Sequence, residues 1–262
     1  IKVKPSPCAR NVGVHFDSSL SFKPFVQKTA AAATYHIRSS VAIRDHLPRD
    51  LVRQLCTSLV ISRLDYCNAV LAGLPKCSLR PLQLALNMAA RLIYKAKRSC
   101  HVSPLLKELH WLPIERRIEE KILTITFKAR NGFAPSYLAE LLKDHIPSRA
   151  LRSSDVPTLA APLFKLKTVG DRSFCSAGPR AWNSLPPSLR AGALACTDAT
   201  PGTVSTLLRC YLLATHFDGL SSDFAILPAT TVARSLRQRA DSPRGSMLAI
   251  KKSSPVNGAQ SL

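Results

Sequence analysis

Between residues 24 and 145, apolar side chains recur every three or four residues, which is the spacing of one face of an α-helix. Proline and glycine residues separate the stretches that have this spacing. Proline is favoured in the first turn of a helix and glycine just after the last. The pattern predicts consecutive helices over residues 24–44, 48–72, 78–97, 103–112, 113–131 and 135–145.

Three of these helices have a well-marked apolar stripe. In the second, the stripe comprises Leu51, Leu55 and Leu59 with Val52, Val60, Leu64, Cys67 and Leu71. In the third it comprises Leu79, Leu82, Leu86, Ala89 and Ile93, and in the fifth Ile114, Ile118, Ile122, Ile125 and Ala129. Short links between such helices predict a mainly α fold, an antiparallel helical bundle.

The flanking regions differ from this pattern. Val12, Val14 and Phe16 alternate with polar residues and predict a short β element at the N-terminus, after which serines offer caps for the first helix. Residues 156–169 predict an extended chain. Asp171 is expected to cap a short helix that runs toward Trp182, and residues 203–217 predict an apolar helix. We therefore expect a strand region at 1–17, a helical bundle at 18–146, an extended, irregular region at 147–190 and a largely disordered tail at 191–262.

The formal net charge is +21, and 30 of the 37 Lys and Arg residues lie within residues 1–192. A field of this sign attracts polyanions through the release of counterions. Basic residues gather at the end of the third predicted helix, beside Tyr94, and at the start of the fifth. The predicted phosphate contacts are Arg91, Lys95, Lys97, Arg98, Arg116 and Arg117. No base-reading pattern accompanies them, so the expected partner is a nucleic acid, bound independently of sequence.

Enzyme motifs are not evident. The eight cysteines form no Cys-x-x-Cys pair, and we expect no metal and no cofactor. Asp65 beside Tyr66 is reminiscent of a polymerase metal box, but a lone carboxylate on a helix does not hold magnesium, and pairing with an arginine is expected instead. Glu119 and Lys121 match half of a metal-nuclease signature, yet they fall on a helix, where a solvated face is expected.

No apolar run is long enough to cross a bilayer, and no signal peptide is visible, so the expected location is nuclear or cytoplasmic, with neither a membrane nor a small-molecule substrate as partner. The chain begins with Ile1 rather than Met, so we expect a fragment or a gene-model product.

Several phrases in order match one family. They are VGVHFDSSLSFKPFV, ISRLDYCNAVLAGLP, LQLALNMAARLIYKAKR, LHWLPIERRIEEKILTITFKARNGFAPSYLAELL, SRALRSSD and KTVGDRSFCSAGPRAWNSLPPSLR. Over about residues 10–190 the chain resembles the C-terminal part of the reverse transcriptase of vertebrate non-LTR retrotransposons, the LINE-type elements related to Jockey.

The resemblance implies that the helices correspond to the thumb and to the extension that follows it. In that family the thumb grips an RNA–DNA hybrid by its backbone, so the partner that the resemblance implies is RNA or an RNA–DNA hybrid. The Tyr/Phe-x-Asp-Asp box and the earlier Asp of the family's polymerase are absent here, so the resemblance implies a piece without catalytic residues. The alternative is a degenerate element copy with no selected biochemical function, and a third reading is a metal nuclease using Glu119 and Lys121.

Overall fold

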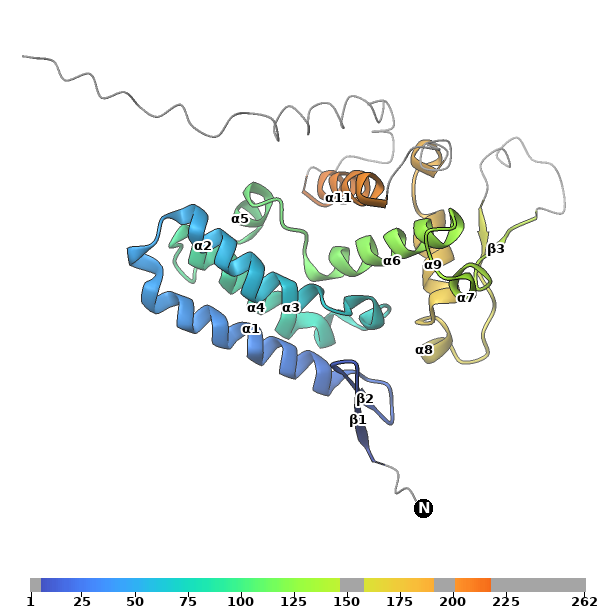
Figure 1. The fold of residues 1–262 in the computed structure, drawn as a ribbon, viewed down its shortest axis with the longest axis horizontal. Coiled ribbons are helices and arrows are strands. Elements are labelled where there is room, and N and C mark those ends of the chain that lie inside the picture. Colours follow the sequence, from blue (N-terminus) through green and yellow to red (C-terminus); the bar gives the residue numbers. More distant parts are fainter. Residues whose placement is uncertain (1–5, 147–157, 191–200, 218–262) are drawn as a thin grey trace, which may run out of the picture. The chain divides into compact units, whose positions relative to one another are not determined.

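The structure, a computed structural model, describes residues 6–146, 158–190 and 201–217. These residues are mostly helical, with a small two-stranded sheet near the N-terminus (Figure 1). The predicted mainly α class and the N-terminal β element are thus confirmed. Among the described residues, none of the helices has the length and apolar character that a membrane span requires. The largely disordered tail predicted at 191–262 lies outside the described residues except at 201–217.

The N-terminal sheet is a hairpin of β1 (Cys8–Asn11) and β2 (Val14–Asp17), in which Asn11 is opposite Val14. Val12 and Gly13 form the turn, with φ of 45° and 80°. A two-residue turn with both φ values positive matches the twist of the flanking strands. The prediction that Val12 shares a strand face with Val14 and Phe16 is therefore wrong: glycine at position 13 permits the turn there and leaves Val12 exposed.

The first helix, α1 (Lys23–Ile43), begins where predicted, but the serines do not cap it. The Asp17 carboxylate accepts hydrogen bonds from the Ser19 hydroxyl at 2.6 Å and from the backbone N–H groups of Ser21 at 2.9 Å and Phe22 at 2.8 Å. These bonds, the one from Ser19 above all, hold the pKa of Asp17 well below its usual range. One carboxylate thereby joins the end of the hairpin to the start of the helix.

The second predicted helix is interrupted. It consists of α2 (Arg49–Cys56), the π-turn η2 (Thr57–Ile61) and α3 (Ser62–Asp65), followed by the 3-10 turn η3 (Asn68–Leu71). Four buried residues are spaced by four, Val52, Cys56, Val60 and Leu64, and Ile61 beside them is also buried. A strict spacing of four drifts around an α-helix of 3.6 residues per turn, and the wider π-turn compensates for that drift. Leu51, which the sequence placed on the buried stripe, is 44% exposed.

The third predicted helix is α4 (Lys76–Tyr94), and its five predicted core residues are all buried. It packs against α1, and small buried residues such as Ala33 and Ala89 keep the helix surfaces flat. The guanidinium of Arg44, at the end of α1, reaches the last carbonyls of α4. The two helices therefore end side by side and run in the same direction (Figure 1).

Next come α5 (Ser103–Glu108) and α6 (Ile114–Arg130), both close to prediction. The helix predicted over 135–145 is wrong beyond its first turn, because only α7 (Ser136–Ala139) forms. The chain then enters β3 (Lys143–Asp144), which pairs antiparallel with β4 (Leu159–Ala160). Leu141 and Ile146 are exposed, so a longer helix would have had few apolar side chains to bury.

The remaining helices are α8 (Lys167–Gly170), α9 (Phe174–Asn183) and α11 (Pro201–Phe217). Ser173, rather than Asp171, occupies the N-cap of α9. The helix predicted at 203–217, within the tail predicted to be largely disordered, is confirmed. Val204, Leu208 and Leu212 lie on one face of α11 and are buried, so this segment belongs to the core.

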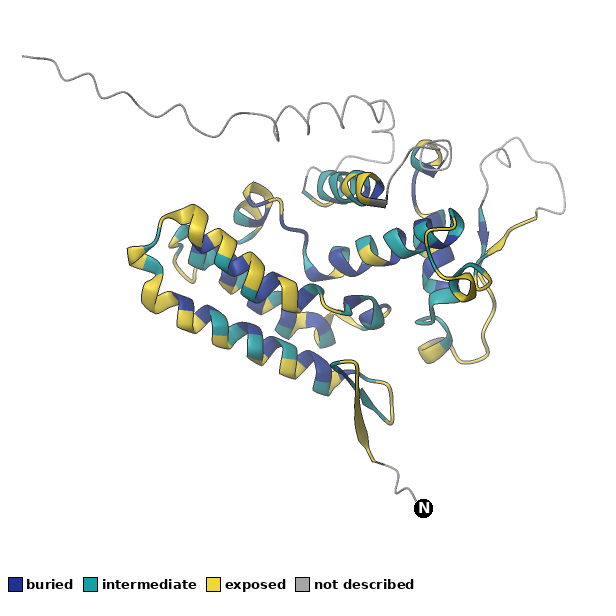
Figure 2. Ribbon diagram, viewed as in Figure 1, coloured by how far each residue is buried: buried dark blue, intermediate teal, exposed yellow. Residues whose placement is uncertain are grey.

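The buried apolar residues form two clusters, and α6 contributes to both (Figure 2). Ile114, Ile118 and Ile122 join the first cluster, with α1, α2, α3 and α4. Leu123 and Phe127 join the second, with Trp182 of α9 and the buried face of α11.

Candidate nucleic-acid interface

The end of α4 forms a Schellman-type cap. Lys95 adopts the left-handed conformation with φ of 51°, its N–H donates to Leu92 O at 3.4 Å, and the N–H of Ala96 donates to Arg91 O at 3.0 Å. The Arg91 guanidinium in turn donates to Cys100 O at 3.1 Å. These bonds fold residues 95–100 back against the helix end and bring Lys97 and Arg98 close to it.

Arg44 adds hydrogen bonds to two of the last carbonyls of α4, Leu92 O, which the cap also uses, and Ile93 O. Its Nε donates to Leu92 O at 2.6 Å, and its Nη2 donates to Ile93 O at 2.9 Å. A cation at this position also opposes the partial negative charge of a helix C-terminus. Beside it, the Lys95 ammonium pairs with Asp45 at 2.6 Å. The hydrogen bond and charge of Lys95 hold the pKa of Asp45 below its ordinary value.

Arg49, at the start of α2, completes this end of the molecule. Its guanidinium pairs with Glu108 at 2.7 Å and lies 3.9 Å from the centre of the Tyr94 ring. The hydrogen bond from Arg49 lowers the pKa of Glu108, and burial raises the pKa of the Tyr94 hydroxyl. The contacts join α2, α4 and α5 at one place.

We call this surface the basic end of α4. It comprises Arg44, Arg49, Arg53, Arg91, Lys95, Lys97 and Arg98, with Asp45, Asp50 and Glu108 as its acidic members. Four of the predicted contacts, those from α4 and the residues after it, therefore lie together. Lys97 and Arg98 are exposed and have no charged partner among the described residues, whereas Arg91 and Lys95 are engaged within the protein.

The other two predicted contacts lie elsewhere. The N–H of Ile114 donates to the Gln83 side chain at 2.9 Å, so α6 begins beside the middle of α4. At 1.5 Å per residue, Gln83 is roughly 16 Å from Tyr94 along that helix. Arg116 is half-buried and pairs with Glu119 at 2.6 Å, three residues along α6.

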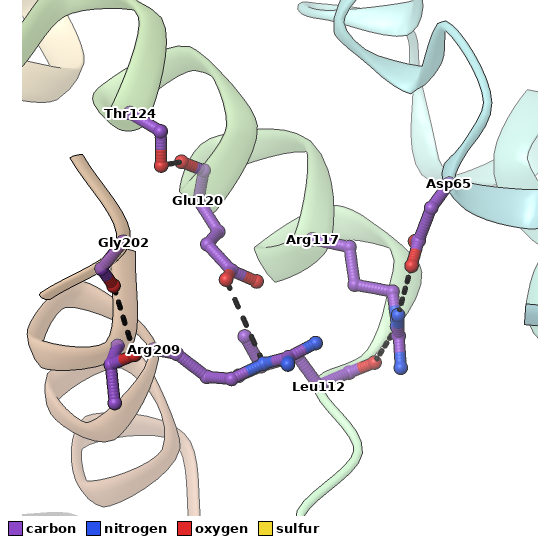
Figure 3. A network of polar contacts seen from close by, with 8 residues as sticks. Asp65, Leu112, Arg117, Glu120, Thr124, Gly202 and Arg209 are labelled. Atoms are coloured by element: carbon purple, nitrogen blue, oxygen red, sulfur yellow. Dashed lines mark hydrogen bonds and ion pairs between the residues drawn. The ribbon is translucent and has the colours of Figure 1, made fainter. Parts of the chain in front are cut away.

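Arg117 is not available to a phosphate, because the whole residue is only 3% exposed. Its Nη1 donates to Asp65 at 2.7 Å and its Nε to Leu112 O at 2.8 Å (Figure 3). The prediction for Arg117 is therefore wrong. The apolar spacing of α6 turns this position inward, where the guanidinium joins α6 to α3. Asp65 was expected to pair with Arg63 or with an arginine from another helix, and the second alternative is confirmed.

The Glu119–Lys121 stretch is helical, as expected, but not fully solvated. The Glu120 side chain is 14% exposed and lies 3.6 Å from Arg209 of α11 (Figure 3). Burial raises the pKa of Glu120, although Arg209 opposes that shift. In the described part of the chain, no three His, Cys, Asp or Glu side chains come together where they could hold a metal ion.

Arg44, Arg49 and Arg53 were not predicted as site residues. The available signal was the spacing of four between Arg49 and Arg53, which puts both on one side of the helix, next to the buried Val52 and Cys56. What the sequence did not show is that α4 and α5 end beside that face.

No protein-family model matches this chain, and the curated proteins and solved structures likewise give no match.

Proposed function

We propose that this chain is the non-catalytic, thumb-like part of a LINE-type reverse transcriptase and that it holds RNA or an RNA–DNA hybrid by its phosphate backbone. The ordered phrases over residues 10–190 support the family assignment. The helical arrangement of α1 to α6 supports the thumb-like reading. The observation that carries the binding proposal is the convergence of seven basic and three acidic residues at the basic end of α4.

The internal contacts divide the basic residues of that surface into those that hold the loop and those that are free to contact phosphate. Arg44, Arg91 and Lys95 have protein partners, so they hold the loop and set the local positive potential. Lys97 and Arg98 remain exposed and are the direct phosphate contacts. Binding through such contacts releases counterions and weakens as salt is raised.

Affinity for a labelled RNA–DNA hybrid, measured against salt concentration, tests this function. Replacing Lys97 and Arg98 by Gln should lower the slope of log affinity against log salt by roughly 1.5 and weaken binding about tenfold at moderate salt. The matched control replaces Lys23 and Lys28, two exposed lysines at the start of α1, by Gln. Along α1, at 1.5 Å per helical residue, Lys23 and Lys28 lie roughly 32 Å and 24 Å from Arg44 at the basic end of α4. Binding that does not depend on salt, or equal losses in both variants, would contradict the proposal.

A further inference from the structure

Two hollows meet on the exposed side of α2. The first, of about 340 Å³, is lined by Arg49, Asp50, Arg53, Tyr94, Glu108 and Leu109. The second, of about 430 Å³, is lined by Arg53, Gln54, Thr57, Ser58, Leu109 and Trp111. Arg53 and Leu109 line both, so the two hollows adjoin each other. The second lies between α2 with its π-turn and the link from α5 to α6, and we call this second hollow alone the α2 groove.

The charges favour an anion in the α2 groove rather than in the first hollow. The first hollow contains two arginines and two carboxylates, and Arg49 is already paired with Glu108. The α2 groove contains Arg53 and no carboxylate. Arg53 is exposed and has no ion-pair partner in the described residues, and the Gln54 amide beside it is exposed as well. Together they offer donors to a phosphate.

The floor of the α2 groove is apolar, and backbone hydrogen bonds hold it in place. His110 adopts the left-handed conformation with φ of 54°, and the N–H of Trp111 donates to Leu106 O at 2.9 Å. This cap holds Leu109 and Trp111 as the floor of the groove, although each is more than nine-tenths buried. An aromatic and an aliphatic side chain at the floor suit the face of a flat ring.

The π-turn supplies polar groups at the rim. The Thr57 hydroxyl donates to Arg53 O at 2.9 Å, and the Ser58 hydroxyl donates to Leu55 O at 3.2 Å. Since both protons are used on backbone carbonyls, the hydroxyl oxygens are left as acceptors for N–H groups of a ligand.

We propose that the α2 groove binds one nucleotide of an unpaired strand, with its phosphate on Arg53 and Gln54 and its base against Leu109 and Trp111. This inference rests on the proposed function and extends it, because it adds a site for a single strand beside the surface that holds the backbone. A paired base is stacked inside its duplex and does not reach the floor of the groove, so the site selects unpaired nucleotides.

Tryptophan fluorescence tests the site, because the chain has two tryptophans, Trp111 and the fully buried Trp182. Titration with a 12-nucleotide oligouridylate should quench the emission, and a hairpin duplex with the same number of phosphates should not. The quenching should persist in Trp182→Phe and disappear in Trp111→Phe. Binding of the same oligonucleotide, labelled and followed by anisotropy, gives the affinity independently.

Arg53→Gln should weaken binding of the oligouridylate roughly tenfold, the effect of losing one charge-assisted contact. Arg38→Gln is the matched control, since Arg38 is exposed on α1 and has no charged partner in the described chain. Quenching by the duplex, quenching that survives in Trp111→Phe, or equal losses in the two arginine variants would overturn the site. If replacing Lys97 and Arg98 still weakens hybrid binding, only the nucleotide site is refuted. If neither the hybrid nor the oligouridylate binds, the proposed function is refuted as well.

Discussion

At the scale of single residues, Arg117 shows how a charge that looks available can be structural. Its guanidinium has two partners inside the protein, the Asp65 carboxylate and Leu112 O, and it joins α6 to the end of α3. Its Nη2 and the Asp65 Oδ1 have no hydrogen-bond partner and are buried. The Arg117 side chain is buried, whereas the Asp65 side chain is 37% exposed. Such a pair gives little net stability, but losing Asp65 leaves the buried charge of Arg117 uncompensated.

Asp65→Ala should therefore lower the free energy of unfolding by roughly 3 kcal/mol, because it leaves the Arg117 charge buried without a counter-ion. The double variant Asp65→Leu, Arg117→Met should recover most of that loss, since both charges are then removed. Urea unfolding measures both effects. Asp50→Ala, at an exposed carboxylate on α2, should change stability by less than about 0.5 kcal/mol. An equal loss of stability in Asp65→Ala and Asp50→Ala would show that Arg117 does not need Asp65 as its counter-ion.

At the scale of elements, α11 is held to α6 by an apolar face and by the contact of Arg209 with Glu120. Burial raises the pKa of Glu120 above its ordinary value of 4.5, so the folded protein disfavours the charged carboxylate. The favourable contribution of the neutral form is complete below pH 4.5 and is lost as pH rises through the folded pKa.

Glu120→Gln should therefore stabilise the protein at pH 7, where the wild-type side chain is charged, and the advantage should shrink as pH falls toward 4. The reason is that glutamine resembles the protonated side chain at every pH. Chemical denaturation of both proteins at several pH values gives the difference. Glu115→Gln is the control, because that residue is exposed on the same helix. A difference that grows toward acidic pH would mean that the contact with Arg209 outweighs burial.

The elements also show what periodicity can and cannot predict. All five predicted stripe residues of α4 are buried, because a regular helix needs no information from elsewhere in the chain, although Ala85 and Ala90 are buried as well. The π-turn was not predicted, since Leu51 and Val52 fit an apolar stripe equally well until the packing selects Val52. The basic cluster after α4 was visible as local sequence. Arg49 and Arg53 reach that cluster only through the packing of α2 on α4, and the α2 groove depends on residues some fifty positions apart.

At the scale of the whole molecule, the two apolar clusters are linked through one helix. One face of α6 contacts the first cluster with Ile118 and Ile122, and another face, farther along the helix, contacts the second with Leu123 and Phe127. Helix α11 packs against the same helix. Loss of either cluster would expose one side of α6. The two cores should therefore unfold together, in a single cooperative transition. Such cooperativity is not expected of an inactive relic whose helices have lost mutual packing.

The two tryptophans allow this to be measured, because Trp111 belongs to the first cluster and Trp182 to the second. In Trp182→Phe the emission reports the first cluster, and in Trp111→Phe it reports the second. Within each variant, the urea midpoint from fluorescence should coincide with the midpoint from helical circular dichroism, so any loss of stability caused by the substitution cancels. If Trp182 emission changed while most of the helical signal remained, the second cluster would unfold independently. The helices α9 and α11 would then add little to the stability of the surface at the basic end of α4.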